Sequence, residues 1–125
     1  GGDDVIIGAA DESGVADNAR DLITDFTLNE DDLDISAGGG TNQHNAVSVE
    51  TDAMGNVAAA TIELIRGNFS DSTDPTASAF TVATDGSDVL VRFEFAGANA
   101  AADVEVGLLG LGANIGDIDI DDFVV

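Results

Sequence analysis

Acidic residues dominate this 125-residue chain: 25 Asp and Glu stand against three Arg and no Lys, which leaves a net charge of −22. A chain this negative repels itself and resists compaction unless cations neutralise the charge or salt screens it. The same charge excludes nucleic acid as a partner, because phosphate binding needs a basic surface. It also excludes an anionic membrane surface. Any compact fold of this chain therefore depends on divalent cations, on high salt, or on both.

The placement of the acidic residues favours calcium. Asp outnumbers Glu by 19 to 6, and Ca²⁺ takes roughly six to eight oxygens from carboxylates and backbone carbonyls. A surface adapted only to salt would spread its acids over every solvated face, whereas many aspartates here gather in turn-like clusters. A saline habitat remains a second explanation for the charge. The clusters are Asp3–Asp4, Asp31–Asp34, Asp85–Asp88 and Asp117–Asp122.

The remaining composition limits the class of protein. The length fits one domain with a single modest core. The absence of cysteine excludes disulfides and thiolate metal sites. No apolar run approaches the ~18 residues of a membrane span, and the first residues do not read as a cleavable secretory signal. We expect a chain that is not inserted into a membrane.

Short apolar and β-branched runs, separated by Gly- and Asp-rich turns, predict an all-β fold. In residues 88–95, Val89, Val91 and Phe93 fall on one face, as in a strand with one side on a core. We expect short antiparallel strands and hairpins in a sandwich or open roll. A helix at 57–65 is the main alternative, because VAAATIELI contains good helix formers. The hairpins are expected between 46–50 and 57–65 and between 80–84 and 88–95, with further strands at 5–7, 21–26, 33–36 and 103–111.

The opening stretch GDDVIIG, residues 2–8, fits the second part of the calcium-binding nonapeptide GGxGxDxUx. In this register Gly2 holds the fourth position, Asp4 the acidic position and Ile6 the large apolar position. Glycine lets the turn adopt positive φ and expose carbonyls, and Asp supplies a carboxylate. An ordinary Gly–Asp turn before a strand would look alike, and Ser13 replaces the acid of the next copy.

Residues 21–36, DLITDFTLNEDDLDIS, resemble the segment after the last calcium turns of RTX exoproteins, notably the serralysin-type metalloproteases. Residues 87–95 resemble a later strand of the same domain. The chain also ends in Asp122-Phe123-Val124-Val125, an acidic residue followed by apolar ones, as type I secretion substrates of this group commonly do. The residues of 21–36 that match the family pattern are Asp21, Ile23, Asp25, Phe26, Asp32, Asp34, Ile35 and Ser36.

The resemblance implies that residues 1–20 are a remnant of a calcium-binding parallel β-roll. Residues 21–125 would then be the C-terminal cap of that roll and a type I secretion signal domain. The implied partners are the exporter, which reads the C-terminus, and the upstream roll of the same chain. The implied protein is bacterial and either secreted or displayed on the cell surface.

The resemblance also assigns metal ligands. Gly2, Asp4 and Asp21 would bind Ca²⁺, with Asp25 as a secondary candidate. Solvated or turn-capping carboxylates explain Asp32 and Asp34 better than metal binding does.

We therefore expect a non-catalytic, calcium-binding domain. His44 is the only histidine, so neither a zinc site nor a Ser–His–acid triad can be assembled around it, and we expect a loop residue. Two other functions stay open. The chain could be a calcium-dependent self-association module of a surface-layer or adhesin protein, or the inert tail of a secreted hydrolase.

Overall fold

The structure is a computed structural model that describes residues 4–6, 20–36, 44–52, 55–70, 79–95 and 99–125. These residues form nine β-strands and two 3₁₀ helices, so the predicted all-β fold is confirmed. The strands are β1 (Asp4–Ile6), β2 (Asp21–Ile23), β3 (Asp32–Asp34), β4 (Ala46–Glu50), β5 (Thr61–Phe69), β6 (Phe80–Val82), β7 (Asp88–Phe93), β8 (Val104–Leu108) and β9 (Phe123–Val124); the 3₁₀ helices are η1 (Gly112–Asp117) and η2 (Ile120–Asp122).

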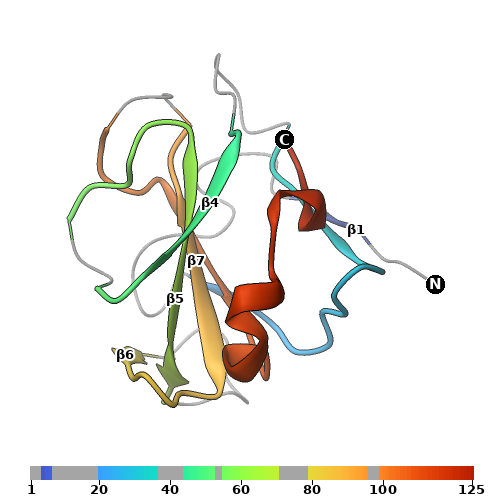
Figure 1. Cartoon of the computed structure of the whole chain (residues 1–125), viewed down its shortest axis with the longest axis vertical. Coiled ribbons are helices and arrows are strands. Elements are labelled where there is room, and N and C mark those ends of the chain that lie inside the picture. Colours follow the sequence, from blue (N-terminus) through green and yellow to red (C-terminus); the bar gives the residue numbers. More distant parts are fainter. Residues whose placement is uncertain (1–3, 7–19, 37–43, 53–54, 71–78, 96–98) are drawn as a thin grey trace.

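The strands form a large mixed sheet and a small parallel sheet (Figure 1). The large sheet has the order β2-β8-β7-β5-β4, and β6 also pairs with β5. Within it, β7 is antiparallel to β5 and β8, whereas β2 and β4 join the edges in parallel. The small sheet has the order β1-β3-β9 and is parallel throughout. It therefore brings together the first strand, an early strand and the last strand.

The two predicted hairpins are wrong, although their strands exist. Strands β4 and β5 run parallel, and a tight hairpin turn cannot join two parallel strands. Strands β6 and β7 do not pair with each other, because both pair with β5 on opposite edges. Strand β6 lies on the same edge of β5 as β4, next to the end of β4. The helix alternative at 57–65 is also wrong, because residues 61–65 belong to β5. Strand β5 pairs along both of its edges, with β4 and β6 on one and β7 on the other. Most of its residues are buried, as is usual for a central strand.

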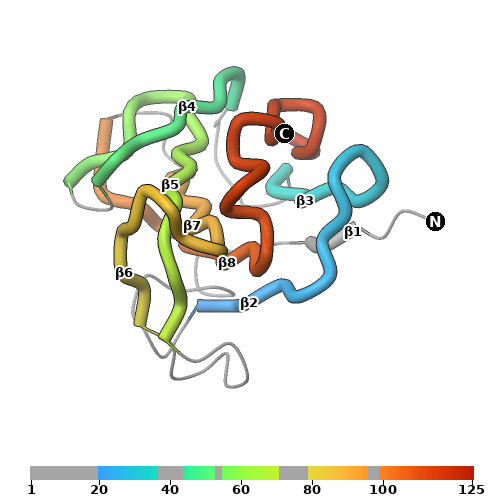
Figure 2. The backbone as a smooth tube through the Cα atoms, turned by 60° about the horizontal axis from the view of Figure 1, so that its bottom comes forward, coloured from blue at the N-terminus to red at the C-terminus, as the bar shows by residue number. Residues whose placement is uncertain are grey.

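The main core lies between the large sheet and the elements that cover it. Val89, Val91 and Phe93 are fully buried in this core, as the alternation in 88–95 predicted. The opposite face of β7 is buried as well, because Leu90 packs in a second cluster with Ile65 and Phe69. Leu33 and Phe123 add to the main core from the small sheet. Helix η1 contacts β5 and β7, and η2 contacts β3, so the C-terminal segment spans from one sheet to the other (Figure 2). The C-terminal residues thus join the two sheets.

Close backbone packing at Gly86 fixes the loop between β6 and β7. A Cβ on Gly86 would overlap the backbone of Gly67, and the carbonyl oxygen of Gly86 leaves no space for a Cβ on Gly112. We expect Gly86→Ala to lower the free energy of unfolding by about 1–3 kcal/mol, because the backbone has to shift. Thermal denaturation measures this, with Gly116→Ala as the control, since nothing lies within 4 Å of a Cβ there. Equal melting temperatures of the two variants would contradict the prediction.

Candidate functional site

The C-terminal residues predicted as the export signal are part of the folded structure. Strand β9 places Phe123 beside Leu33 of β3, and the N–H of Ile35 donates to the carbonyl oxygen of Val124 at 2.9 Å. Phe123 is 6% exposed, whereas Val124 and Val125 are 37% and 50% exposed. The aromatic residue of the motif therefore anchors the strand, and the valines face solvent in part.

Asp122 braces this segment from inside the fold, where it is 4% exposed. Its Oδ1 accepts the N–H of Asn29 at 3.2 Å, and its Oδ2 accepts the N–H of Asp119 at 3.0 Å. Asp119 in turn accepts the N–H of Asp121 at 2.9 Å, which completes a capping box around η2. Asn29 lies in a turn with a φ of 64°. The acidic residue of the motif thus ties the last strand to a turn early in the chain.

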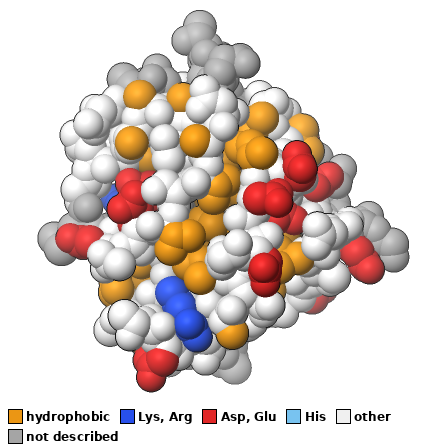
Figure 3. All heavy atoms as spheres, in the orientation of Figure 1, with side chains coloured by type: hydrophobic (Ala, Val, Ile, Leu, Met, Phe, Trp, Pro, Cys, Tyr) orange, Lys and Arg blue, Asp and Glu red, His pale blue; other side chains and the backbone are white. Residues whose placement is uncertain are grey.

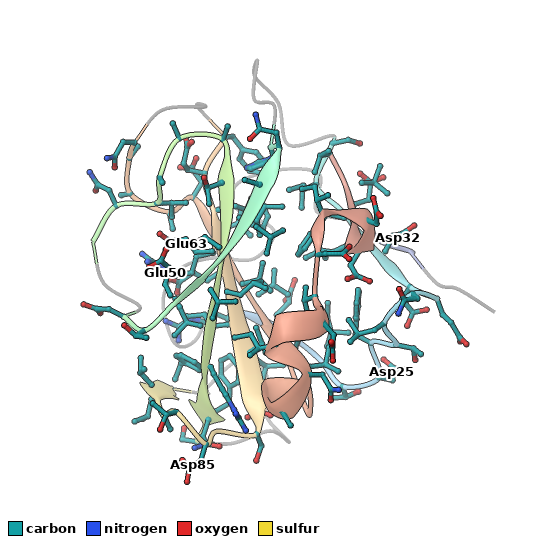
Figure 4. The ribbon with its side chains drawn as sticks, viewed as in Figure 1. Asp25, Asp32, Glu50, Glu63 and Asp85 are labelled. Atoms are coloured by element: carbon teal, nitrogen blue, oxygen red, sulfur yellow. The ribbon has the colours of Figure 1, made fainter. Side chains whose placement is uncertain are left out.

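The residues predicted to bind Ca²⁺ do not gather in one place within the described ranges. Gly2 lies outside those ranges. The position of Asp4 is known from backbone pairing, which sets it in register with Asp32. Asp21 begins β2 at an edge of the large sheet. Asp25 is exposed, and Figure 4 shows it with Asp32 on the side of the molecule that carries the small sheet. No group of three or more His, Asp or Glu in the described residues is arranged to hold a metal ion.

Two rows of the small sheet contain aspartates with different surroundings. Asp4 and Asp32 are register partners, and like charges at adjacent positions destabilise a sheet. Aspartate is a residue type that Ca²⁺ prefers as a ligand, and the backbone register sets two aspartates in this row. Asp34 accepts hydrogen bonds from the hydroxyl and the N–H of Ser36 at 2.7 and 2.9 Å, and these bonds lower the pKa of Asp34. The turn-capping interpretation of Asp34 is confirmed.

A row of alternating charges crosses the large sheet on the face opposite the main core, and no local sequence pattern indicates it. Arg92 lies at its centre, with Nη1 donating to Glu63 at 3.1 Å and Nε donating to Glu105 at 2.8 Å. The Nε of Arg20 donates to the other carboxylate oxygen of Glu105 at 2.8 Å. All four side chains are only 6–10% exposed. We name Glu63, Arg92, Glu105 and Arg20 the ion-pair row.

The ion-pair row is electrically balanced but sensitive to loss of a member. Glu63, Arg92 and Glu105 are register partners on adjacent strands, so the pleat holds their side chains on one face. Burial raises the pKa of Glu63, and the charge of Arg92 opposes this. The Nη2 of Arg92 also donates to the carbonyl oxygen of Gly55 at 3.1 Å. Two of the three arginines of this acidic chain therefore form buried ion pairs within the fold.

His44 lies outside the strands, as expected of a loop residue, but it is 5% exposed. Its Nε2 is 3.1 Å from the carbonyl oxygen of Glu94, and its ring meets Phe93 edge-on with centroids 5.7 Å apart. Burial lowers the pKa of His44 below 6.5, although the hydrogen bond to Glu94 and the charge of Glu94 act in the opposite direction. The folded protein therefore holds a neutral imidazole against its core at neutral pH.

The buried His44 makes stability depend on pH. Because the pKa of His44 is lower in the folded state than its ordinary 6.5, the unfolded state binds more protons as the pH falls through 6.5. The free energy of unfolding is then expected to decrease on acidification from neutral pH, until the folded-state pKa is reached. Urea denaturation at several pH values measures this slope. A slope that is unchanged in His44→Gln would contradict the assignment to this residue.

Searches for related proteins add no identity. No protein-family model matches the chain, and no curated protein matches it. Neither 3₁₀ helix in the described part of the chain is long and apolar enough to cross a membrane. The function is therefore inferred from the chemistry and geometry of the residues.

Proposed function

We propose that the chain is a non-catalytic, calcium-binding C-terminal domain of a secreted RTX protein, acting as a folding cap and a type I secretion signal. The small parallel sheet is the observation that supports this best. It sets the strand of the GDDVIIG motif in one sheet with the C-terminal strand, with β3 between them. Strand β1 is an edge of this sheet, and an edge strand offers unpaired N–H and C=O groups to a further strand. An upstream parallel β-roll would continue the sheet from that edge.

Calcium would act on this domain through linkage between binding and folding. At low cytosolic Ca²⁺, the repulsion among 25 acidic residues would keep the chain loose enough for export. Outside the cell, Ca²⁺ would bind the folded form alone and drive folding by mass action. Gly2, Asp4, Asp21 and Asp25 are the proposed ligands. The backbone register that pairs Asp4 with Asp32 supports a cation there, because it sets two acidic residues in one row of the sheet.

The proposed export signal comprises Asp122, Phe123, Val124 and Val125. Asp122 and Phe123 are buried in the folded domain, so an exporter would read them in the loose chain, before calcium-driven folding. The same residues then close the small sheet after export. One short segment would serve first as a signal and later as the last strand of the cap.

A secretion assay tests the proposed signal. The full chain is co-expressed with a type I exporter, and the amount in the medium is compared with a truncation after Asp121 and with Leu33→Ala. Both variants disturb the small sheet, because Leu33 is fully buried beside Phe123, but only the truncation removes the signal. We expect export of the full chain and of Leu33→Ala, and no export of the truncation. Equal export of the truncated chain would refute the signal.

A further inference from the structure

A groove of about 230 Å³ lies beside β5, in the gap between the end of β4 and the end of β6. Its apolar lining includes Val49, Val82 and Ile115, so strands and the η1 helix both contribute. Val49 is 53% exposed and Val82 is 40% exposed. Figure 3 shows apolar side chains running down this face of the molecule, with a basic side chain at the lower end. The groove therefore combines exposed hydrocarbon surface with a positive charge, which Arg66 supplies.

Arg66 is held by a backbone hydrogen bond, and no carboxylate of the described residues forms an ion pair with it. Its Nε donates to the carbonyl oxygen of Gly86 at 2.7 Å. Among the described residues, the ion pairs of arginine involve Arg20 and Arg92 and not Arg66. A guanidinium has five N–H donors, and within the described ranges the hydrogen bond of Arg66 uses only the Nε donor, which leaves the two terminal nitrogens for another group. In a chain with 25 acidic residues, the fold leaves this one cation beside an apolar groove.

Glu50 is the acidic residue that lines the groove, and its carboxylate is engaged elsewhere. Its Oε1 accepts the hydroxyl of Ser48 at 2.6 Å, and its charge contributes to the raised pKa of Glu63. Figure 4 shows Glu50 and Glu63 near each other. The carboxylate of Glu50 is thus bonded to Ser48 at the rim of the groove, and among the ion pairs of the described residues there is none between Glu50 and Arg66.

We propose that this groove binds a small monocarboxylate that carries a short hydrocarbon chain. The planar guanidinium of Arg66 matches a carboxylate through two parallel N–H···O bonds. The hydrocarbon chain would cover Val49, Val82 and Ile115, and removing their apolar surface from water favours binding. This inference is independent of calcium binding and of export, because it rests on residues that neither function uses.

Hexanoate is the probe that tests the proposal, with hexanol as the probe that lacks the carboxylate. Backbone amide resonances of the full chain, folded in millimolar Ca²⁺, are followed by NMR during each titration. About 0.5 M NaCl is present so that repulsion by the protein's net charge is screened. We expect hexanoate to shift the resonances of Val49, Val82 and Ile115 and to bind more tightly than hexanol. Equal affinities for hexanoate and hexanol would overturn the proposal.

Variants assign the effect to the guanidinium. Arg66→Met is expected to weaken hexanoate binding about tenfold and to leave hexanol binding unchanged. Unchanged hexanoate affinity in this variant would also overturn the proposal. Glu50→Gln gives a second test that keeps Arg66 and its bond to Gly86. It is expected to tighten hexanoate binding more than Asp25→Asn, which changes the net charge equally at an exposed site away from the groove. Equal effects of the two charge variants would contradict the proposed site.

Discussion

Replacing Arg92 with methionine is expected to lower the free energy of unfolding by about 3–5 kcal/mol. The guanidinium of Arg92 pairs with both Glu63 and Glu105 in a place where all three side chains are less than 10% exposed. Methionine keeps much of the hydrocarbon volume but leaves Glu63 buried without its ion-pair partner. Glu105 keeps its bond to Arg20. The cost therefore comes mainly from one uncompensated buried carboxylate.

Urea denaturation in millimolar Ca²⁺ measures this loss, with no NaCl added because NaCl would screen the charges further. Arg66→Met is the matched control, because it removes the same charge from a partly exposed arginine outside the ion-pair row. We expect a change within about 1 kcal/mol for that variant. Glu63→Gln in the Arg92→Met background should restore part of the stability, since the buried charge disappears. Equal destabilisation by Arg92→Met and Arg66→Met would show that the ion-pair row does not stabilise the fold.

Truncating Phe123 to alanine is expected to cost about 3–5 kcal/mol and to release the last strand. The ring is 6% exposed, belongs to the main core and lies in register with Leu33. Its loss leaves a cavity at the place where the two sheets share their core. The bond from the N–H of Ile35 to the carbonyl oxygen of Val124 should then open more often.

Two measurements report on this change. Urea denaturation gives the stability, and amide hydrogen exchange at Ile35 reports pairing of β9 with β3. Val125→Ala is the matched control, because Val125 belongs to the same motif but is 50% exposed; we expect a change within about 0.5 kcal/mol. If Phe123→Ala behaved like Val125→Ala, or if Ile35 kept its protection, the C-terminal strand would not hold the fold together.

Local pattern predicted the strands well because it depends on neighbouring residues. Strand β4 occupies the stretch 46–50 that alternation indicated, and the buried face of β7 carries the residues expected on it. Pairing was not predictable in the same way. A turn-like sequence at 51–56 suggested a hairpin, but β4 joins β5 in parallel. The pairing of strands depends on how their faces are buried across the whole sheet. The amino-acid composition of a turn carries no information about that burial.

The functional residues show the same difference between local motifs, which the sequence reveals, and distant contacts, which it does not. The C-terminal acidic and apolar motif was visible in the sequence, but the brace at Asp122 depends on Asn29, which is 93 positions away. The alternation of Arg92 and Glu94 with apolar residues in 88–95 was a signal that a charged group faces one side of that strand. Its partners, Glu63 and Glu105, come from two other strands whose register no local pattern shows. Arg66 gave no sequence signal beyond its rarity in an acidic chain.

Circular dichroism of the isolated chain in chelator, followed by titration with Ca²⁺ and separately with Mg²⁺ and NaCl, tests the central proposal most directly. The proposal predicts that β structure appears only with Ca²⁺, at millimolar concentration, because the cation binds the folded form alone. A chain that is fully folded in chelator, or that folds equally well in NaCl, would contradict calcium-driven folding. The negative charge would then be a general adaptation of the surface.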